Sequence, residues 1–153
     1  MSRRHQVRIE KAGGRGRVFL TTLLGPSFVR DPLYLLLLAA GLTAWLLPRP
    51  GAGPGLGWLA IKAAVEELAF RFGLQETLNV RLGERQVLPL LGLGNLLASA
   101  AFALLHLVSH PPLWALATFI PSLAFGLAWD RHRGLLPCWL LHFAYNALHF
   151  HRP

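Results

Sequence analysis

Charged residues are scarce in this chain. They make up 14% of its 153 residues, whereas soluble domains usually carry about 25%. Apolar residues make up 54%, which is too many for polar side chains to cover the surface of a compact water-soluble domain. An intrinsically disordered chain is excluded as well, because such chains have low hydrophobicity. The composition therefore favours a small membrane protein with several spans over a soluble single domain.

Cysteine occurs once, as Cys138, so the chain forms no intrachain disulfide and no thiolate metal cluster. Cys138 lies in an apolar run, where we expect it to be a small packing residue. Two catalytic signatures are missing too, because the sequence contains neither an HExxH zinc motif nor a GxSxG serine element. The aspartates, Asp31 and Asp130, lie at the ends of predicted helices, which disfavours an aspartyl protease pair.

Acidic residues are outnumbered by lysine and arginine, 7 to 15. Such a balance indicates either nucleic acid or an anionic membrane surface as partner. Seven of the cations precede the first long apolar run, as in a cytoplasmic juxtamembrane segment, and no base-stacking or groove-reading motif is present. We therefore expect no nucleic-acid partner. Residues 1–31 are predicted to form a basic cytoplasmic segment, and residues 32–153 a domain embedded in the lipid bilayer.

Five helical spans are predicted. They are Pro32–Pro48, Gly57–Val80, Val87–Val108, Leu113–Trp129 and Leu135–Phe150. The first is slightly short of the roughly 20 residues of a full span, and Pro121 predicts a kink in the fourth. The segments on the N-terminal side of the membrane, 1–31, 81–86 and 130–134, hold eleven of the fifteen cations. The sequence thus predicts an all-α polytopic bundle in a bacterial inner membrane, with its N-terminus in the cytoplasm.

Ionisable residues occur inside these apolar helices, where a charged side chain costs about 2.5–3.5 kcal/mol. The segment VEELAFR carries Glu66, Glu67 and Arg71. Glu67 and Arg71 are four residues apart and are expected to pair on one helix face, whereas Glu66 projects about 100° away. Taken alone, this pattern also fits an amphipathic interfacial helix with a solvated ion pair.

Two further motifs place polar residues in apolar helices. FALLH puts Phe102 and His106 one turn apart, and HFAYN puts His142 and Asn146 on one helix face. Alone, they fit an interfacial histidine and an interhelical hydrogen-bond pair. Together with the glutamates, they can satisfy one another around a single polar cavity. A carboxylate beside histidines activates water, and imidazole and amide groups stabilise an oxyanion, so the residues indicate peptide or ester hydrolysis inside the membrane.

In this order, EELAFR, FALLH and HFAYN resemble the three signature motifs of the CAAX-prenyl-protease and bacteriocin-processing (CPBP) family of intramembrane glutamic endopeptidases. The resemblance covers roughly residues 59–150. It implies that Glu66 is the general base and that His106 helps to position or protonate the reacting groups. It also implies that His142 and Asn146 stabilise the oxyanion.

The same resemblance implies that Glu67 and Arg71 organise the site, with Phe102 supporting it, and that catalysis needs no metal or cofactor. A zinc site made of glutamate and histidine stays open as an alternative. Two other classes also stay open: a non-catalytic membrane binding or immunity protein of the same fold, and a proton-relay or transport module.

The expected substrate is a membrane-anchored protein or peptide. Eukaryotic relatives that process prenylated proteins have more spans, so processing of a lipidated protein is kept as the alternative. With the N-terminus inside, His106 lies two residues from the outer end of its predicted helix, and the site opens outward. This orientation favours the tail of an exported protein, such as a bacterial C-terminal sorting signal.

Overall fold

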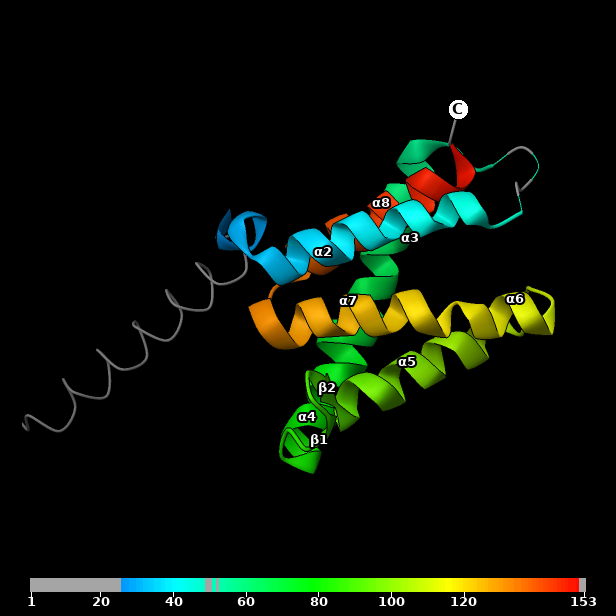
Figure 1. Ribbon diagram of the computed structural model, residues 1–153. Coiled ribbons are helices and arrows are strands. Elements are labelled where there is room, and N and C mark those ends of the chain that lie inside the picture. The colour runs from blue at the N-terminus through cyan, green and yellow to red at the C-terminus, as the bar shows by residue number, and fades with distance from the viewer. Residues whose placement is uncertain (1–25, 49–50, 52, 152–153) are drawn as a thin grey trace, which may run out of the picture.

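The structure is a computed structural model that describes residues 26–48, 51 and 53–151, and these residues are mostly helical (Figure 1). The elements are η1 (Pro26–Arg30), α2 (Pro32–Ala40), η2 (Gly41–Leu46), α3 (Leu56–Glu67), η3 (Leu68–Gln75), α4 (Glu76–Leu82), β1 (Gln86–Leu88), β2 (Leu91–Gly92), α5 (Leu93–His106), α6 (Pro112–Ala117), α7 (Phe119–His132) and α8 (Leu135–Phe150). The prediction of a helical fold is confirmed. Most of the predicted basic segment, up to residue 25, lies outside the described residues.

The apolar helix α2 begins at a side-chain cap. Asp31 accepts a hydrogen bond of 3.1 Å from the backbone N–H of Leu33, and Pro32 occupies the first turn, where its missing N–H does no harm. At Gly41, α2 tightens into the 3-10 helix η2. A Cβ at Gly41 would lie 2.8 Å from the ring of Tyr145 on α8, so this glycine allows the two helices to approach closely.

The second predicted span is confirmed as a helix, but its winding changes along its length. It runs as α3, then as the π-helix η3, then as α4, without a break in the backbone. It ends at Gly83, whose φ of 73° is the left-handed conformation that closes a helix. The residue types in this segment do not distinguish a π-helix from an α-helix, so the sequence did not predict it.

The third predicted span, Val87–Val108, is wrong over its first part. Its first residues form the antiparallel hairpin of β1 and β2, and the helix α5 begins only at Leu93. The turn contains Pro89 and Leu90, and Leu90 adopts a φ of 69°. Proline supplies no backbone N–H and fixes its own φ, which keeps this stretch out of the helix although residues 87–91 are all apolar.

The fourth predicted span is interrupted, as expected, but three residues before Pro121. Helix α6 ends at Ala117 and α7 starts at Phe119. A proline cannot donate the hydrogen bond to the carbonyl four residues earlier, and for Pro121 that carbonyl belongs to Ala117. The fifth predicted helix is confirmed with the bounds of α8.

The helices form two layers joined by the long α3–η3–α4 helix. Helix α8 packs against η2 and α3 in one layer, and α7 packs against α5 beside it (Figure 1). The α3–η3–α4 helix crosses behind α7, and η3 contacts α5, α7 and α8. The residues of η3 therefore lie where three other helices meet.

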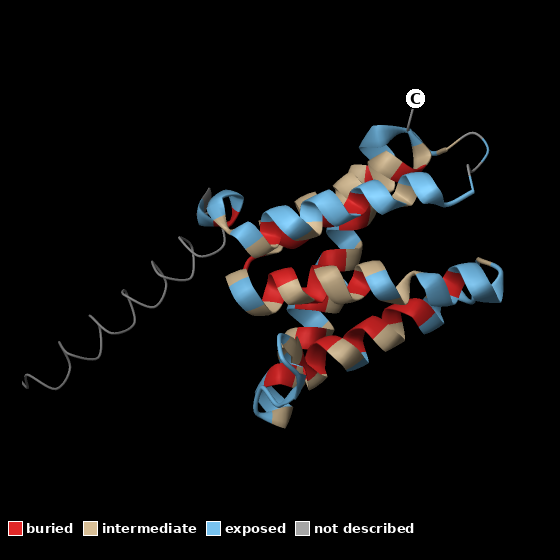
Figure 2. Ribbon diagram, viewed as in Figure 1, coloured by how far each residue is buried: buried red, intermediate tan, exposed pale blue. Residues whose placement is uncertain are grey.

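The interior contains several large polar side chains beside an apolar core around Phe125 and Leu141, and much of the surface is apolar. Arg71, Gln75, Glu67, Asn95 and Ser99 are among the largest fully buried side chains. Leucine, valine and isoleucine side chains are exposed on many helices, and Figure 2 shows exposed residues on most of the helices. A large exposed apolar surface marks contact with a membrane or a protein partner. Within the described residues, one helical stretch, Pro112–His132, is long and apolar enough to cross a membrane, and Pro32–Leu46 and Leu93–His106 are shorter apolar helices.

Candidate active site

The glutamates lie at the point where α3 passes into the π-helix. Glu66 and Glu67 are the last residues of α3, and Arg71 and Gln75 follow in η3. Hydrogen bonds to the fifth preceding residue define this winding, and π-helical turns occur frequently at functional sites. Glu67, Arg71 and Gln75 are completely buried. The change of winding thus occurs within the motif that the sequence singled out.

Glu67 bridges a cation and a ring. Its Oε2 accepts a hydrogen bond of 3.2 Å from Nε of Arg71, which confirms the predicted pair. Its Oε1 lies 2.7 Å from Nδ1 of His142 on α8. Because a carboxylate oxygen accepts hydrogen bonds, Nδ1 of His142 carries the hydrogen, and Nε2 is left to face other groups.

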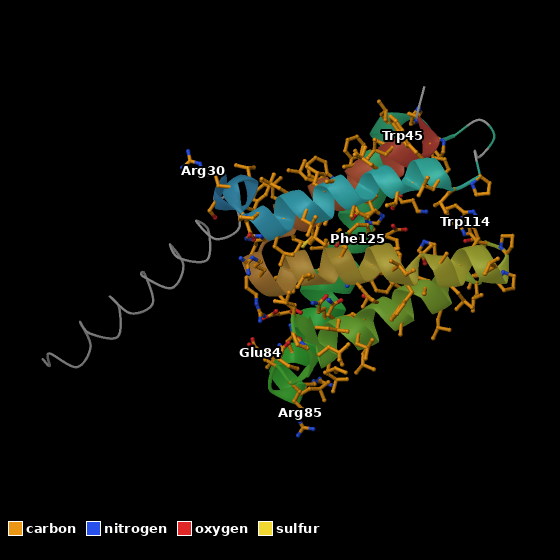
Figure 3. The ribbon with its side chains drawn as sticks, in the orientation of Figure 1. Arg30, Trp45, Glu84, Arg85, Trp114 and Phe125 are labelled. Atoms are coloured by element: carbon orange, nitrogen blue, oxygen red, sulfur yellow. The ribbon has the colours of Figure 1, made fainter. Side chains whose placement is uncertain are left out.

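His142 is held in place by stacking as well. The ring of Phe125 lies parallel to it, with centroids 4.5 Å apart and planes at 15°. Figure 3 places Phe125 in the centre of the molecule, between α7 and the layer that contains α2 and α8. Packing on one ring face and a hydrogen bond at Nδ1 together fix the orientation of the imidazole.

Glu66 is the more accessible of the two glutamates. Its Oε2 lies 3.5 Å from Nε2 of His142, and 18% of its side chain is exposed, against 1% for Glu67. Its Oε1 lies 3.5 Å from Nζ of Lys62. Within the described residues, Oε2 of Glu66 is buried and has no hydrogen-bond partner. This oxygen is therefore a carboxylate oxygen without a hydrogen bond, next to an imidazole nitrogen.

The second motif lies beside the first. Nδ1 of His106 lies 2.8 Å from the carbonyl oxygen of Phe102, and since a carbonyl only accepts, this nitrogen carries the hydrogen. The Phe102 ring lies between the two histidines, with centroids 4.4 Å from His106 and 5.9 Å from His142. The structure thus brings both histidines to one aromatic residue, without a hydrogen bond between His106 and Glu66.

Asn146 lies one turn after His142 on α8 and is partly exposed. Among the residues that the structure describes, its side-chain amide has no hydrogen-bond partner. It therefore shares a helix with His142, as predicted, but makes no hydrogen bond to Glu66, Glu67 or His106. Its donors remain available to a bound molecule.

Several buried polar residues around the site were missed from the sequence. They are Gln75, Asn79, Asn95, Ser99 and Ser122, together with the partly buried Asp130. A signal was present, because Gln75 and Asn79 continue the four-residue spacing of Glu67 and Arg71. Single polar residues in apolar runs, such as Ser122, carry the same kind of signal.

No three His, Cys, Asp or Glu side chains in the described part of the chain come together in a way that could hold a metal ion. Glu66, Glu67 and His142 form instead a cluster of two carboxylates around one imidazole.

The described residues combine a buried cluster of two glutamates and one histidine with an extensive exposed apolar surface, and ionisable clusters of this kind mark functional sites in membrane proteins. The profile of one protein family, described as "Type II CAAX prenyl endopeptidase Rce1-like", matches residues 48–148. The match covers more than half of the chain, so the protein belongs to this family of membrane proteases, and the resemblance predicted from the three motifs is confirmed. No curated protein and no solved structure matched the chain.

Proposed function

We propose that this protein is an intramembrane endopeptidase in which Glu66 activates the attacking water. The position of Glu66 carries the proposal, because 18% of its side chain is exposed and its Oε2, which has no hydrogen-bond partner within the described residues, lies 3.5 Å from Nε2 of His142. Glu67 is buried and already accepts hydrogen bonds from His142 and Arg71. A general base must reach a water molecule, and Glu66 meets this requirement better than Glu67.

The remaining motif residues complete the reaction. Glu66 removes a proton from water as the oxygen adds to the peptide carbonyl, and this proton can pass between Glu66 and Nε2 of His142. With the proton on Nε2, His142 donates to the oxyanion, beside the amide of Asn146. As the C–N bond breaks, the proton taken from water passes to the leaving amine, and His106 helps to position the attacking water by accepting a hydrogen bond at its unprotonated Nε2. The carboxylate of Glu67 stabilises the charge on His142.

The proposed substrate is the membrane-associated tail of another protein, either the C-terminal sorting signal of an exported protein or a lipidated CAAX-type terminus. The family description supports the second class. The predicted topology supports the first, since Arg81, Arg85, Arg131 and Arg133 lie in the segments expected inside. We further propose a bundle of about five spans in a bacterial inner membrane, with the N-terminus cytoplasmic.

The decisive experiment compares the purified protein with Glu66→Gln on a panel of tail peptides, with and without a prenylated cysteine, by mass spectrometry. Glu84→Gln is the matched control, because Glu84 is an exposed carboxylate that pairs with Arg133 at the far end of α4. We expect cleavage by wild type and Glu84→Gln, none by Glu66→Gln, and no effect of chelator. Cleavage by Glu66→Gln would contradict the assigned base. Loss of cleavage on adding chelator would show a metalloprotease.

A panel on which the wild type cleaves no peptide would favour a non-catalytic binding protein. The topology has its own test, which is labelling of Ser2→Cys in intact cells with a membrane-impermeant maleimide. Cys138 is fully buried and does not compete for the label. Labelling from outside would contradict a cytoplasmic N-terminus and remove the argument for an exported substrate.

A further inference from the structure

The buried face of the α3–η3–α4 helix carries a continuous line of polar side chains. Glu67, Arg71, Gln75 and Asn79 follow one another at intervals of four residues, and each is at most 3% exposed. Only the first two belong to a recognised motif. Buried polar side chains without partners are costly, so the partners of the last two show what this line does.

Three helices supply hydrogen-bond acceptors to the guanidinium group of Arg71. Besides Glu67, it donates from Nη1 to Oε1 of Gln75 at 2.9 Å and from Nη2 to Oγ of Ser122 on α7. Oγ of Ser99 on α5 lies 3.5 Å from Nη1 and donates its own hydrogen to Asn95 at 3.0 Å. The planar group is therefore held along several directions, which fixes where its Nε points.

Gln75 is oriented from its other end. Its Nε2 donates to the carbonyl oxygen of Gly126 at 2.9 Å and to Oδ1 of Asp130 at 2.9 Å. The same Asp130 oxygen accepts a hydrogen bond of 2.8 Å from Asn79. With both amide hydrogens facing α7, Oε1 of Gln75 must face Arg71. The side-chain amide of Gln75 thus links Asp130 on α7 to the guanidinium group of Arg71.

We propose that Ser122 and Gln75 are positioning residues for the candidate active site, acting through Arg71 and Glu67 on the tautomer of His142. Ser122 and Gln75 hold Arg71 so that its Nε faces Glu67. Oε1 of Glu67 then faces Nδ1 of His142. Nδ1 keeps its hydrogen, and Nε2 faces Glu66. Neither positioning residue contacts the reacting groups. The proposal rests on the proposed function for its effect on catalysis, but not for its effect on His142.

The test combines nitrogen-15 NMR of histidine-labelled protein in detergent micelles with steady-state kinetics on a cleaved tail peptide. His142→Asn assigns the ring signals of His142. The variant is Ser122→Ala, which removes one oxygen from a fully buried site. Ser122→Thr restores the hydroxyl, and Cys138→Ala is the matched control, because it removes one atom from an equally buried site on α8.

For Ser122→Ala we expect a mixture of His142 tautomers, a kcat about tenfold lower, as for the loss of a hydrogen bond to a charged group, and an unchanged KM. Ser122→Thr should restore the wild-type tautomer and kcat, and Cys138→Ala should alter neither. A wild-type His142 spectrum in Ser122→Ala would overturn the proposal, and so would an equal change in Cys138→Ala. If Ser122→Ala does not fold, Ser122→Cys fills the site with a slightly larger thiol that accepts hydrogen bonds only weakly, and the same outcomes apply to it.

The two proposals fail in different ways. If the wild type cleaves no peptide, the proposed function fails, and the His142 spectrum of Ser122→Ala still decides whether Ser122 positions the ring. If the wild type cleaves and the His142 spectrum of the variant is unchanged, the positioning role fails and the proposed function stands.

Discussion

Nδ1 of His142 donates a hydrogen bond of 2.7 Å to Glu67, a residue 75 positions earlier in the chain. The contact joins α8 to the end of α3 in the interior, and both side chains are at most 5% exposed. Glu67 also holds Arg71, so one carboxylate orients the imidazole and neutralises a buried guanidinium. Its neighbour Glu66 pairs instead with Lys62 and faces the other ring nitrogen of His142.

Lys62 in α3 pairs with Glu66, and Arg71 in η3 pairs with Glu67, each four residues away. Removing the two cations should have different effects on stability. Arg71 is completely buried, whereas 42% of the Lys62 side chain is exposed. Arg71→Met leaves the carboxylate of Glu67 buried without its cation and should lower the free energy of unfolding by about 3–5 kcal/mol. Lys62→Met should lower it by less than about 1 kcal/mol. Thermal and SDS denaturation in micelles measure both, and equal losses would contradict the buried pair.

Substitution of Asn146 should mainly lower activity, whereas substitution of Asn95 should mainly lower stability. Asn146 has no hydrogen-bond partner within the described residues, so Asn146→Ala should lower kcat by about 10²–10³, as for the loss of an oxyanion donor. Its unfolding free energy should change by less than about 0.5 kcal/mol. Asn95 is fully buried and bonded to Ser99 and to the carbonyl oxygen of Leu123, so Asn95→Ala should mainly lower stability. A variant of Asn146 that cleaves at the wild-type rate would remove it from the site.

Gly126 marks the closest approach of α7 to its neighbours. A Cβ there would lie 1.9 Å from Oδ1 of Asn95 and 2.8 Å from Oε1 of Gln75. Gly126→Ala should therefore lower the free energy of unfolding by about 1–3 kcal/mol through overpacking. The control is Gly57→Ala in α3, where a Cβ meets nothing within 4 Å, and it should raise stability by about 0.5–1 kcal/mol. Melting temperatures that shift in the same direction would contradict this difference.

Asp31 should make stability depend on acid pH. The hydrogen bond from Arg131 lowers the pKa of the Asp31 carboxyl below its ordinary value of 3.8, and His132 lies beside it, with Nε2 3.1 Å from Oδ2. Since the folded state favours the ionised form, this stabilisation is complete above the unfolded pKa and is lost as the pH falls through the folded pKa. Melting temperatures of wild type and Asp31→Asn should differ at neutral pH and converge at acid pH, below the ordinary pKa of 3.8. Parallel curves down to that pH would contradict this role of Asp31.

Local patterns predicted the parts of the molecule that local chemistry decides. The four-residue spacing of Glu67 and Arg71 gave their ion pair, and the apolar run from Leu135 to Phe150 gave α8 with its observed bounds. The three motifs also indicated which helices meet, since His142 does contact both glutamates.

The sequence could not give features that depend on distant partners or on backbone winding. Ser122 lies 51 residues after Arg71, and Asp130 lies 55 residues after Gln75. Their roles follow only from the packing of α7 against η3. The hairpin before α5 was missed because apolar residues at the edge of a membrane domain resemble the start of a span, whatever backbone they adopt. The π-helix has no compositional signal of its own.

The winding of η3 also sets the rotation of α3 relative to α4 about the helix axis. In an α-helix, positions four residues apart drift around the axis by about 40° at each step, so Asn79 would be about a third of a turn away from Glu67. The slower winding of Leu68–Gln75 offsets this drift and keeps both residues on the buried side. Tightening this stretch to α-helical spacing would twist the glutamates against α4 and the hairpin. The number of residues between Glu67 and Asn79 therefore matters as much as their identity. An insertion or deletion there would rotate the glutamates of the site about the helix axis relative to Asn79.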